Sequence, residues 1–215
     1  MIEIKNISKQ YTRGSKVFSA LQDINCTIVK GEFCYIVGPS GAGKSTLLHI
    51  IGGLIHPDTG TILYNGNDIY KQSSRNINQY RKNSLGFMFQ QFHLMSYLTV
   101  NENIKLACYN KKQTENINYY LDKCSLSEMK NKYPSELSVG EKQRTAFIRA
   151  IISGPELLLA DEPTGNLDPG NSKILMSLLK EFNDKSGTVI LVSHDSGMAD
   201  FANRKILLEK GILIE

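Results

Sequence analysis

Residues 38–46 read GPSGAGKST, and this glycine-rich stretch decides the fold. It follows the apolar run EFCYIV at 32–37 and runs into KSTLLHIIGGL at 44–54, where apolar residues recur at helical spacing. Its first eight letters match G-x-x-x-x-G-K-[ST], a pattern that needs a strand before it and a helix after it. Glycines let backbone N–H groups approach phosphate oxygens closely, and a helix N-terminus adds partial positive charge. The stretch therefore predicts a loop that holds a polyphosphate.

The loop assigns a role to three of its side chains. Lys44 would reach the β and γ phosphates of a nucleotide, Ser45 would bind Mg²⁺, and Thr46 would contact the α phosphate. The alternative is a glycine-rich turn with an incidental lysine, and the flanking strand and helix argue against it. The predicted ATP-binding residues of the loop are Gly38, Pro39, Ser40, Gly41, Ala42, Gly43, Lys44, Ser45 and Thr46.

An acidic pair follows another apolar run. ELLLAD at 156–161 ends in Asp161, and Glu162 comes next. Ligands of α/β sheets bind at the carboxyl ends of strands, so Asp161 is predicted beside the metal and Glu162 beside an attacking water. An isolated acidic pair of this kind is commonly a solvated strand end or a helix cap. Its combination with the phosphate loop favours the catalytic role.

Strand and helix patterns alternate along most of the chain, which predicts an α/β fold with a mostly parallel sheet of the P-loop NTPase type. Besides 32–37, buried strands are expected at 85–90, 156–161, 188–195 and 204–211, and further helices at 141–152 and 171–185. The runs at 2–9, 25–31 and 59–66 are separated by turn residues and predict an antiparallel β subdomain. We expect one domain over 1–215, in which 1–90 and 154–215 form the core with the antiparallel subdomain and 91–153 form an inserted helical subdomain.

The composition limits the class of protein. With 215 residues, of which 41% are hydrophobic and 21% charged, the chain is typical of a globular protein. No apolar run reaches the length of a membrane-spanning helix, and MIEIKNISKQ at the N-terminus has no apolar signal core, so we expect the chain in the cytosol. The four cysteines lack CxxC spacing and are expected to be reduced thiols. A net charge of +4 does not by itself indicate nucleic acid or lipid, and no nucleic-acid partner is predicted.

Three further motifs resemble those of the ATP-binding subunit of ABC transporters. They are LSVGEKQR at 137–144, LLLADEPTGNLD at 157–168 and VSHD at 192–195, and they stand in the family's order at the family's spacing. DEPTGNLD and GFMFQQFHLMSYLTVNENI at 86–104 are most similar to the branch with the lipoprotein-release, macrolide-export and antimicrobial-peptide ATPases and the cell-division ATPase. The resemblance implies ATP hydrolysis with Mg²⁺ as cofactor.

The resemblance also implies roles for residues outside the loop. Tyr11 would stack on adenine, Gln90 would touch Mg²⁺ and the attacking water, and His194 would contact the γ phosphate. Asp168 matches the aspartate of a loop that crosses the interface between two subunits, although an aspartate before proline is also a common helix cap. The predicted catalytic residues are Lys44, Gln90, Glu162 and His194, and the predicted metal ligands are Ser45, Gln90 and Asp161.

The family signature corresponds to Ser138, Val139, Gly140 and Glu141. It implies a second helix N-terminus that faces the ATP of another subunit, so that hydrolysis requires a homodimer or a pair of related ATPases. The commonest form of this signature is LSGGQ, and the chain departs from it twice. Because a β-branched residue disfavours positive φ, we expect Val139 to have negative φ and to present its amide to the phosphate. Glu141 is expected to point away from the phosphate.

The resemblance places the chain on the cytoplasmic face of a membrane, bound to an integral permease subunit. An apolar stretch that would line the groove for this permease contains Phe89, Phe92, Leu94, Met95, Tyr97 and Leu98, although at least half of these residues are as well explained as core of the helical insertion. A cell-division type of ATPase, which transmits force without transport, is the alternative function. A P-loop kinase and a soluble translation or repair ATPase explain fewer of the motifs. The sequence does not reveal the cargo.

Overall fold

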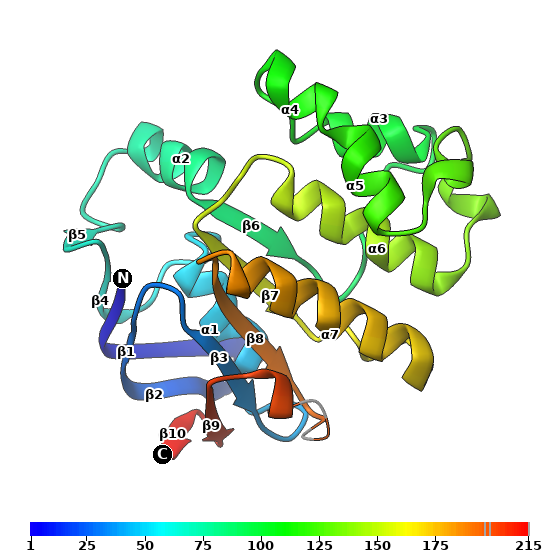
Figure 1. Cartoon of the computed structure of the whole chain (residues 1–215). Helices are drawn as coiled ribbons and strands as arrows, with labels where there is room; N and C mark the ends of the chain where they lie inside the picture. Colours follow the sequence, from blue (N-terminus) through cyan, green and yellow to red (C-terminus); the bar gives the residue numbers. More distant parts are fainter. Residues whose placement is uncertain (196, 198, 215) are drawn as a thin grey trace.

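A computed structural model of the chain describes residues 1–195, 197 and 199–214, and its centre is a mostly parallel sheet (Figure 1). The strand order is β10-β9-β3-β8-β7-β6, and only the β9–β10 pair is antiparallel. The predicted α/β class is thereby confirmed. The strands of this sheet are β3 (Phe33–Val37), β6 (Leu85–Met88), β7 (Leu157–Asp161), β8 (Thr188–Ser193), β9 (Arg204–Glu209) and β10 (Ile212–Ile214).

The central strands are short, apolar and buried on both faces. Every residue of β3, β7 and β8 is buried, as expected for parallel strands covered by helices on both sides. Since these strands and β6 run in the same direction, their carboxyl ends meet at one edge of the sheet. The stretch expected as one strand over 204–211 instead ends at Glu209 and turns into β10 through Lys210 and Gly211, which both have positive φ.

A second sheet of four antiparallel strands has the order β2-β1-β4-β5 and confirms the predicted antiparallel unit. Its strands are β1 (Ile2–Arg13), β2 (Lys16–Ile28), β4 (Thr59–Tyr64) and β5 (Asn67–Asp68). β1 and β2 are longer than the predicted strands because they form a hairpin that extends beyond the core. The first four residues of β2 are exposed, so the apolar alternation that reveals a strand in sequence is missing there.

Helices cover both faces of the parallel sheet (Figure 1). α1 (Lys44–Ile51) buries Leu47, Leu48, Ile50 and Ile51 in a core shared with the antiparallel sheet. On the opposite face, α6 (Val139–Ile151) and α7 (Pro169–Asp184) pack in a second core. α2 (Ser74–Asn83) was not predicted, since its sequence SRNINQYRKN buries only Tyr80 and lacks an apolar stripe.

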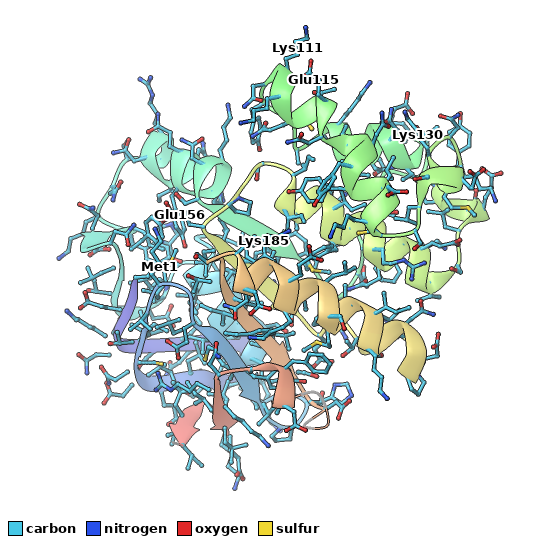
Figure 2. The ribbon with its side chains drawn as sticks, viewed as in Figure 1. Met1, Lys111, Glu115, Lys130, Glu156 and Lys185 are labelled. Atoms are coloured by element: carbon cyan, nitrogen blue, oxygen red, sulfur yellow. The ribbon has the colours of Figure 1, made fainter. Side chains whose placement is uncertain are left out.

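The segment 91–153 contains helices and no strand within the described residues, which agrees with the predicted helical insertion. Besides α6, it holds α3 (Val100–Lys105), α4 (Lys111–Glu115) and α5 (Ile117–Lys123), with short 3₁₀ turns at Ser127–Met129 and Pro134–Glu136. A last 3₁₀ turn, Ala199–Phe201, precedes β9. Lys111, Glu115 and Lys130 project from the insertion away from the sheet (Figure 2). No helix among the described residues combines the length and apolar character needed to cross a bilayer.

Asn103 fixes the loop that leads from β6 into α3. Its side chain is fully buried and makes four hydrogen bonds to the backbone. The amide nitrogen donates to the carbonyls of Met95, Leu98 and Thr99 at 3.1, 2.9 and 3.0 Å, and Oδ1 accepts from the Met95 amide at 2.7 Å. The backbone conformation of residues 95–99 is therefore fixed by the buried side-chain amide of Asn103.

Replacing Asn103 by Ala is expected to lower the free energy of unfolding by about 2 kcal/mol, because these buried backbone groups lose their partner. Urea denaturation followed by circular dichroism measures the change. Asn101→Ala is the matched control, since that side chain takes no part in the four bonds. Equal midpoints for the two variants would contradict the assigned role of Asn103.

Candidate active site

The carboxyl ends of β3, β6, β7 and β8 surround a cavity of about 450 Å³. It lies where the sheet meets the hairpin of β1 and β2, since Tyr11 and Ala20 complete its wall. Nine of the twelve predicted ATP-binding residues line it, and so does Glu162. The full lining is Tyr11, Ala20, Ser40, Gly41, Gly43, Lys44, Ser45, Thr46, Gln90, Glu162 and His194.

The phosphate loop owes its shape to glycine. Gly43, the N-cap of α1, has a φ of 103°, a conformation that L side chains rarely adopt. A Cβ at Gly43 would lie 2.2 Å from the carbonyl oxygen of Ala20, so the loop and β2 are in close contact here. Gly38, Pro39 and Ala42 do not line the cavity, and their contact with ATP stays a prediction. Ala42 is buried within the loop.

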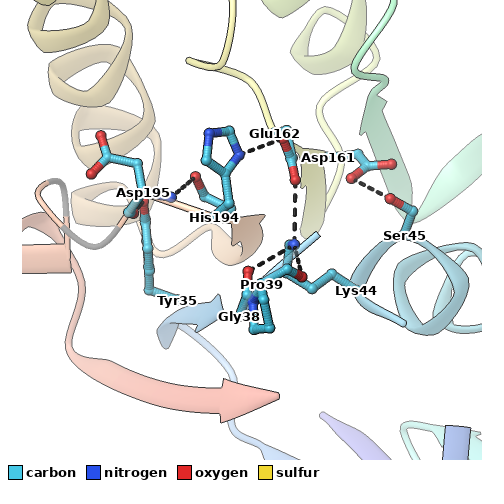
Figure 3. Close-up of polar contacts among 10 residues, drawn as sticks. Tyr35, Gly38, Pro39, Lys44, Ser45, Asp161, Glu162, His194 and Asp195 are labelled. Carbon is cyan, nitrogen blue, oxygen red and sulfur yellow. Dashed lines mark hydrogen bonds and ion pairs between the residues drawn. The ribbon is translucent and has the colours of Figure 1, made fainter. Parts of the chain in front are cut away.

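Lys44 is buried and folds back onto the loop (Figure 3). Its Nζ donates to the carbonyl oxygens of Gly38 and Pro39 at 2.9 and 3.0 Å and lies 3.4 Å from Glu162 Oε1. A buried ammonium normally has a fixed anionic partner, and here it has two neutral carbonyls and one carboxylate. These contacts therefore hold the Lys44 ammonium group where the loop motif predicts that the phosphates bind.

Ser45 and Asp161 form the candidate metal site. Ser45 Oγ donates to Asp161 Oδ1 at 2.9 Å (Figure 3). Burial raises the pKa of the Asp161 carboxyl, although the bond from Ser45 opposes the shift. His49, one helical turn after Ser45, has its Nε2 3.9 Å from Asp161 Oδ2, and burial lowers the pKa of this imidazole. The His49 ring also packs against the rings of Phe87 and Phe89.

Glu162 sits at the end of β7 with an unusual backbone. Its φ is 43°, which costs an L-residue roughly 1–2 kcal/mol. Oε2 of Glu162 pairs with His194 Nδ1 at 2.7 Å, and because a carboxylate only accepts hydrogen bonds, Nδ1 is the donor (Figure 3). Strain of this kind is typical of functional sites. Glu162, His194 and Lys44 thus form one connected group at the cavity.

Gln90 and Tyr11 line the cavity from two distant parts of the chain. β6 ends at Met88, two residues before Gln90, so Gln90 is an exposed loop residue rather than the end of the predicted strand 85–90. Tyr11 lies on β1 opposite Phe18 and is 42% exposed, which leaves its ring available for stacking. Ala20 was missed in the sequence, because a single alanine in a hairpin carries no pattern.

The four signature residues begin α6 and do not line the cavity. Val139 is the first residue of the helix and is absent from the positive-φ residues, so the prediction of negative φ is confirmed. The expected direction of Glu141 is wrong. Its Oε2 accepts from the backbone N and from Oγ of Ser138 at 2.7 and 2.8 Å, while its own amide donates to Ser138 Oγ at 3.3 Å. Glu141 therefore folds back onto the signature serine.

Asp168 caps α7, and Asn171 joins it to the signature helix. Asp168 Oδ1 accepts from the Asn171 amide at 3.0 Å, and Asp168 Oδ2 accepts from Asn171 Nδ2 at 2.6 Å. Arg144 Nη1 of α6 donates to Asn171 Oδ1 at 2.7 Å. A Cβ on Gly140 would lie 2.5 Å from the same Oδ1, so a larger residue there would have to displace the Asn171 carboxamide. The sequence gives no signal for Asn171, because its role depends on a contact with Arg144 of α6, 27 residues earlier.

The donors around Ser45 fit Mg²⁺ better than a transition metal. They are a hydroxyl, a carboxylate and the amide of Gln90, all of which offer oxygen, the donor that Mg²⁺ prefers. In the described part of the chain no three His, Cys, Asp or Glu side chains form a metal-binding group. Mg²⁺ keeps several waters and takes few protein ligands beside substrate phosphates. Ser45, Asp161 and Gln90 would hold the ion.

A larger cavity of about 720 Å³ lies between β5 and α2. Its wall is rich in carboxamides, including those of Asn67, Gln72, Asn76 and Gln79. It contains neither a glycine-rich loop nor a paired lysine and glutamate. The polyphosphate site is therefore the smaller cavity at the sheet edge.

The fold and the site define a P-loop nucleotide-binding protein of the NTPase class. The chain belongs to the ABC transporter family, whose ABC transporter model matches residues 21–165. It is 40% identical over 223 residues to the uncharacterized ABC transporter ATP-binding protein MJ1508 of Methanocaldococcus jannaschii, and the match covers 100% of this chain and 98% of that one. This confirms the resemblance seen in the motifs.

Two further relatives bear on the branch and the assembly. The chain is 39% identical to the macrolide export ATP-binding/permease protein MacB of Chlorobaculum tepidum, and the match covers 100% of the chain but 34% of MacB. A dimeric structure of the ATP-binding cassette MJ0796 in a post-hydrolysis state, bound to ADP and Pi, superposes with a TM-score of 0.93 at 35% identity and covers 100% of this chain and 97% of that one. The chain thus spans about a third of the length of MacB and nearly all of the single cassettes.

Proposed function

We propose that the chain binds ATP and Mg²⁺ and hydrolyses ATP as one of two subunits that pair around two nucleotides. One observation carries this proposal: the cavity is lined by the phosphate loop, Gln90 and Glu162, whereas the exposed Ser138 and Asp168 of the same chain do not line it. A single chain therefore supplies only one wall of the site. The ADP- and Pi-bound dimer of the related cassette MJ0796 supports the same arrangement.

The chain's residues divide the chemistry between them. Glu162 accepts a hydrogen bond from the attacking water and takes its proton as the water oxygen bonds to the γ phosphorus and ADP departs. Lys44 neutralises charge on the β and γ phosphates, after exchanging Glu162 for phosphate oxygens. His194 lies beside Glu162 and the cavity, where it orients the water and the γ phosphate. Mg²⁺, held by Ser45, Asp161 and Gln90, supplies further charge neutralisation.

A membrane permease is the proposed partner, and the chain would lie on the cytoplasmic face of the membrane. A cavity of about 290 Å³ between β6, α3 and α6 is suited to receive a short helix, since Leu106 and Tyr109 at its wall are exposed. Arg149, also on this wall, donates to the carbonyls of His93 and Phe92 at 2.7 and 2.6 Å and so connects the cavity to the loop after Gln90.

The six residues of the apolar stretch predicted for this groove differ in their exposure to solvent. Met95 and Tyr97 are exposed, and Tyr97 reaches 73%, whereas Phe89, Phe92, Leu94 and Leu98 are half-buried. None of the six lines the cavity. The groove is therefore built mainly from β6, α3 and α6, with Met95 and Tyr97 at most on its rim.

Export driven by ATP is the proposed activity of the assembly, on the basis of the name of MacB and the 39% identity to it. A cell-division type of assembly, in which closure transmits force without transport, uses the same ATPase residues and remains the alternative. Copurification from membranes distinguishes them by the kind of permease that is recovered. A kinase is disfavoured, since it has no use for the signature at the start of α6.

The proposal predicts that ATP turnover per molecule rises with protein concentration, because each site needs a wall from a second chain. A dilution series of the purified chain, assayed for phosphate release at saturating MgATP, measures this dependence. Mass determination by light scattering in ATP and in ADP is the companion measurement, with a dimer expected in ATP. A constant turnover number and a monomeric mass throughout the series would contradict the pairing.

A further inference from the structure

Glu141 occupies the hydrogen-bond donors of the signature serine. Its Oε2 takes both the amide and the hydroxyl of Ser138, at 2.7 and 2.8 Å. In the proposed dimer the Ser138 hydroxyl faces the γ phosphate of the partner's ATP, so the Glu141 carboxylate competes with a phosphate oxygen for this donor. The inference drawn from this contact rests on the proposed function.

The carboxylate is charged at neutral pH. The bonds from the Ser138 hydroxyl and amide lower the pKa of the Glu141 carboxyl, and the charges of Arg144 and Lys132 act in the same direction. Two anions cannot share one pair of donors at low cost, because like charges repel and each displaces the other's hydrogen bonds. When a γ phosphate approaches, Glu141 must therefore either break its hydrogen bonds to Ser138 or stay beside a second negative charge.

We infer that Glu141 is an internal competitor of the partner's γ phosphate at Ser138, and that it weakens the ATP-bound dimer. It is a positioning residue, since it acts through Ser138 and touches no reacting atom. The position normally suits either Glu or Gln, because both side chains cap a helix from its third residue. Glu141→Gln consequently keeps one oxygen that can accept from both the Ser138 amide and its hydroxyl, while it removes the negative charge.

The chain contains a matched control for this substitution. Thr99 and Glu102 form a capping box at the start of α3 with the same contacts, in which Glu102 Oε2 accepts from the backbone N and Oγ1 of Thr99 at 2.9 and 2.8 Å. The Glu102 amide donates to Thr99 Oγ1 at 3.3 Å, the same distance as in the Ser138 box. Glu102→Gln therefore reproduces the change in cap and net charge outside the signature.

The test measures the dissociation constant of the dimer in saturating ATP, by sedimentation velocity, for variants that also carry Glu162→Gln to prevent hydrolysis. The dimer of Glu162→Gln/Glu141→Gln is expected to be at least about tenfold tighter than that of Glu162→Gln, since a charge is removed at each of two sites. Glu162→Gln/Glu102→Gln is expected to match Glu162→Gln. Glu162→Gln/Glu141→Ala, which loses both cap and charge, should also be tighter.

Each outcome has a separate meaning. An unchanged or weaker dimer with Glu141→Gln overturns the inference while the proposed function stands. Equal tightening by Glu102→Gln also overturns it, because the effect would then come from net charge alone. If Glu162→Gln alone stays monomeric in ATP, the proposed pairing fails and the inference fails with it. A gain in affinity cannot be produced by a variant that merely unfolds.

Discussion

Replacing Glu162 by Gln is expected to lower the rate of ATP hydrolysis by about 10²- to 10⁴-fold, the usual contribution of a general base. Gln keeps the size of the side chain and its contact with His194 but cannot take a proton from water. ATP binding is expected to persist, because the loop and Lys44 are untouched, and the uncleaved nucleotide should hold the dimer together. Phosphate release and the mass of the chain in ATP measure the two effects.

The control is Glu156→Gln, the same substitution one residue before the start of β7. Glu156 pairs with the Tyr64 hydroxyl at 3.1 Å, and its side chain does not line the cavity. The Glu156→Gln variant is expected to hydrolyse ATP at the rate of the unchanged chain. Rapid hydrolysis by Glu162→Gln would remove Glu162 from the role of base and leave His194 as the next candidate.

The parallel core was predictable because its strands carry a strong local pattern. β3, β7 and β8 are short apolar runs bounded by turn residues, and residues with a chemical role stand at or directly after the end of each. Position along the strand then predicts position in space, since parallel strands bring their carboxyl ends to one edge. For this reason the sequence alone predicts that the loop at 38–46 and the pair at 161–162 share one site.

Features that depend on contacts between distant segments were not predictable. α2 has no apolar stripe, and the first part of β2 has no alternation, so neither gives a periodic signal. Asn103 and Asn171 are ordinary asparagines in sequence, and their roles arise from bonds to loops and helices that the fold brings near. The direction of Glu141 has another cause: its hydrogen bonds to the Ser138 cap outweigh the repulsion expected near a phosphate site.

The second large effect is expected for Asp161→Asn, which should raise the stability of the nucleotide-free chain and lower its ATPase activity. Burial raises the pKa of this carboxyl above its unfolded value, so its contribution to stability is greatest at low pH and falls as the pH rises through the folded pKa. At neutral pH the charge is thus a cost to the nucleotide-free chain. Asp161→Asn removes it and keeps an acceptor for Ser45, so the melting temperature is expected to rise by about 2–4 °C.

The same variant is expected to lose at least about 10²-fold in Mg²⁺-dependent hydrolysis, because the metal site loses its charged ligand. Ser45→Ala separates the two effects. It also removes a metal ligand, but it leaves Asp161 charged and buried without the bond at 2.9 Å, so its melting temperature should fall. Calorimetry of both variants without nucleotide, and phosphate release across a Mg²⁺ series, test the pair. A lower melting temperature for Asp161→Asn would mean that the carboxylate supports the fold rather than serving the metal alone.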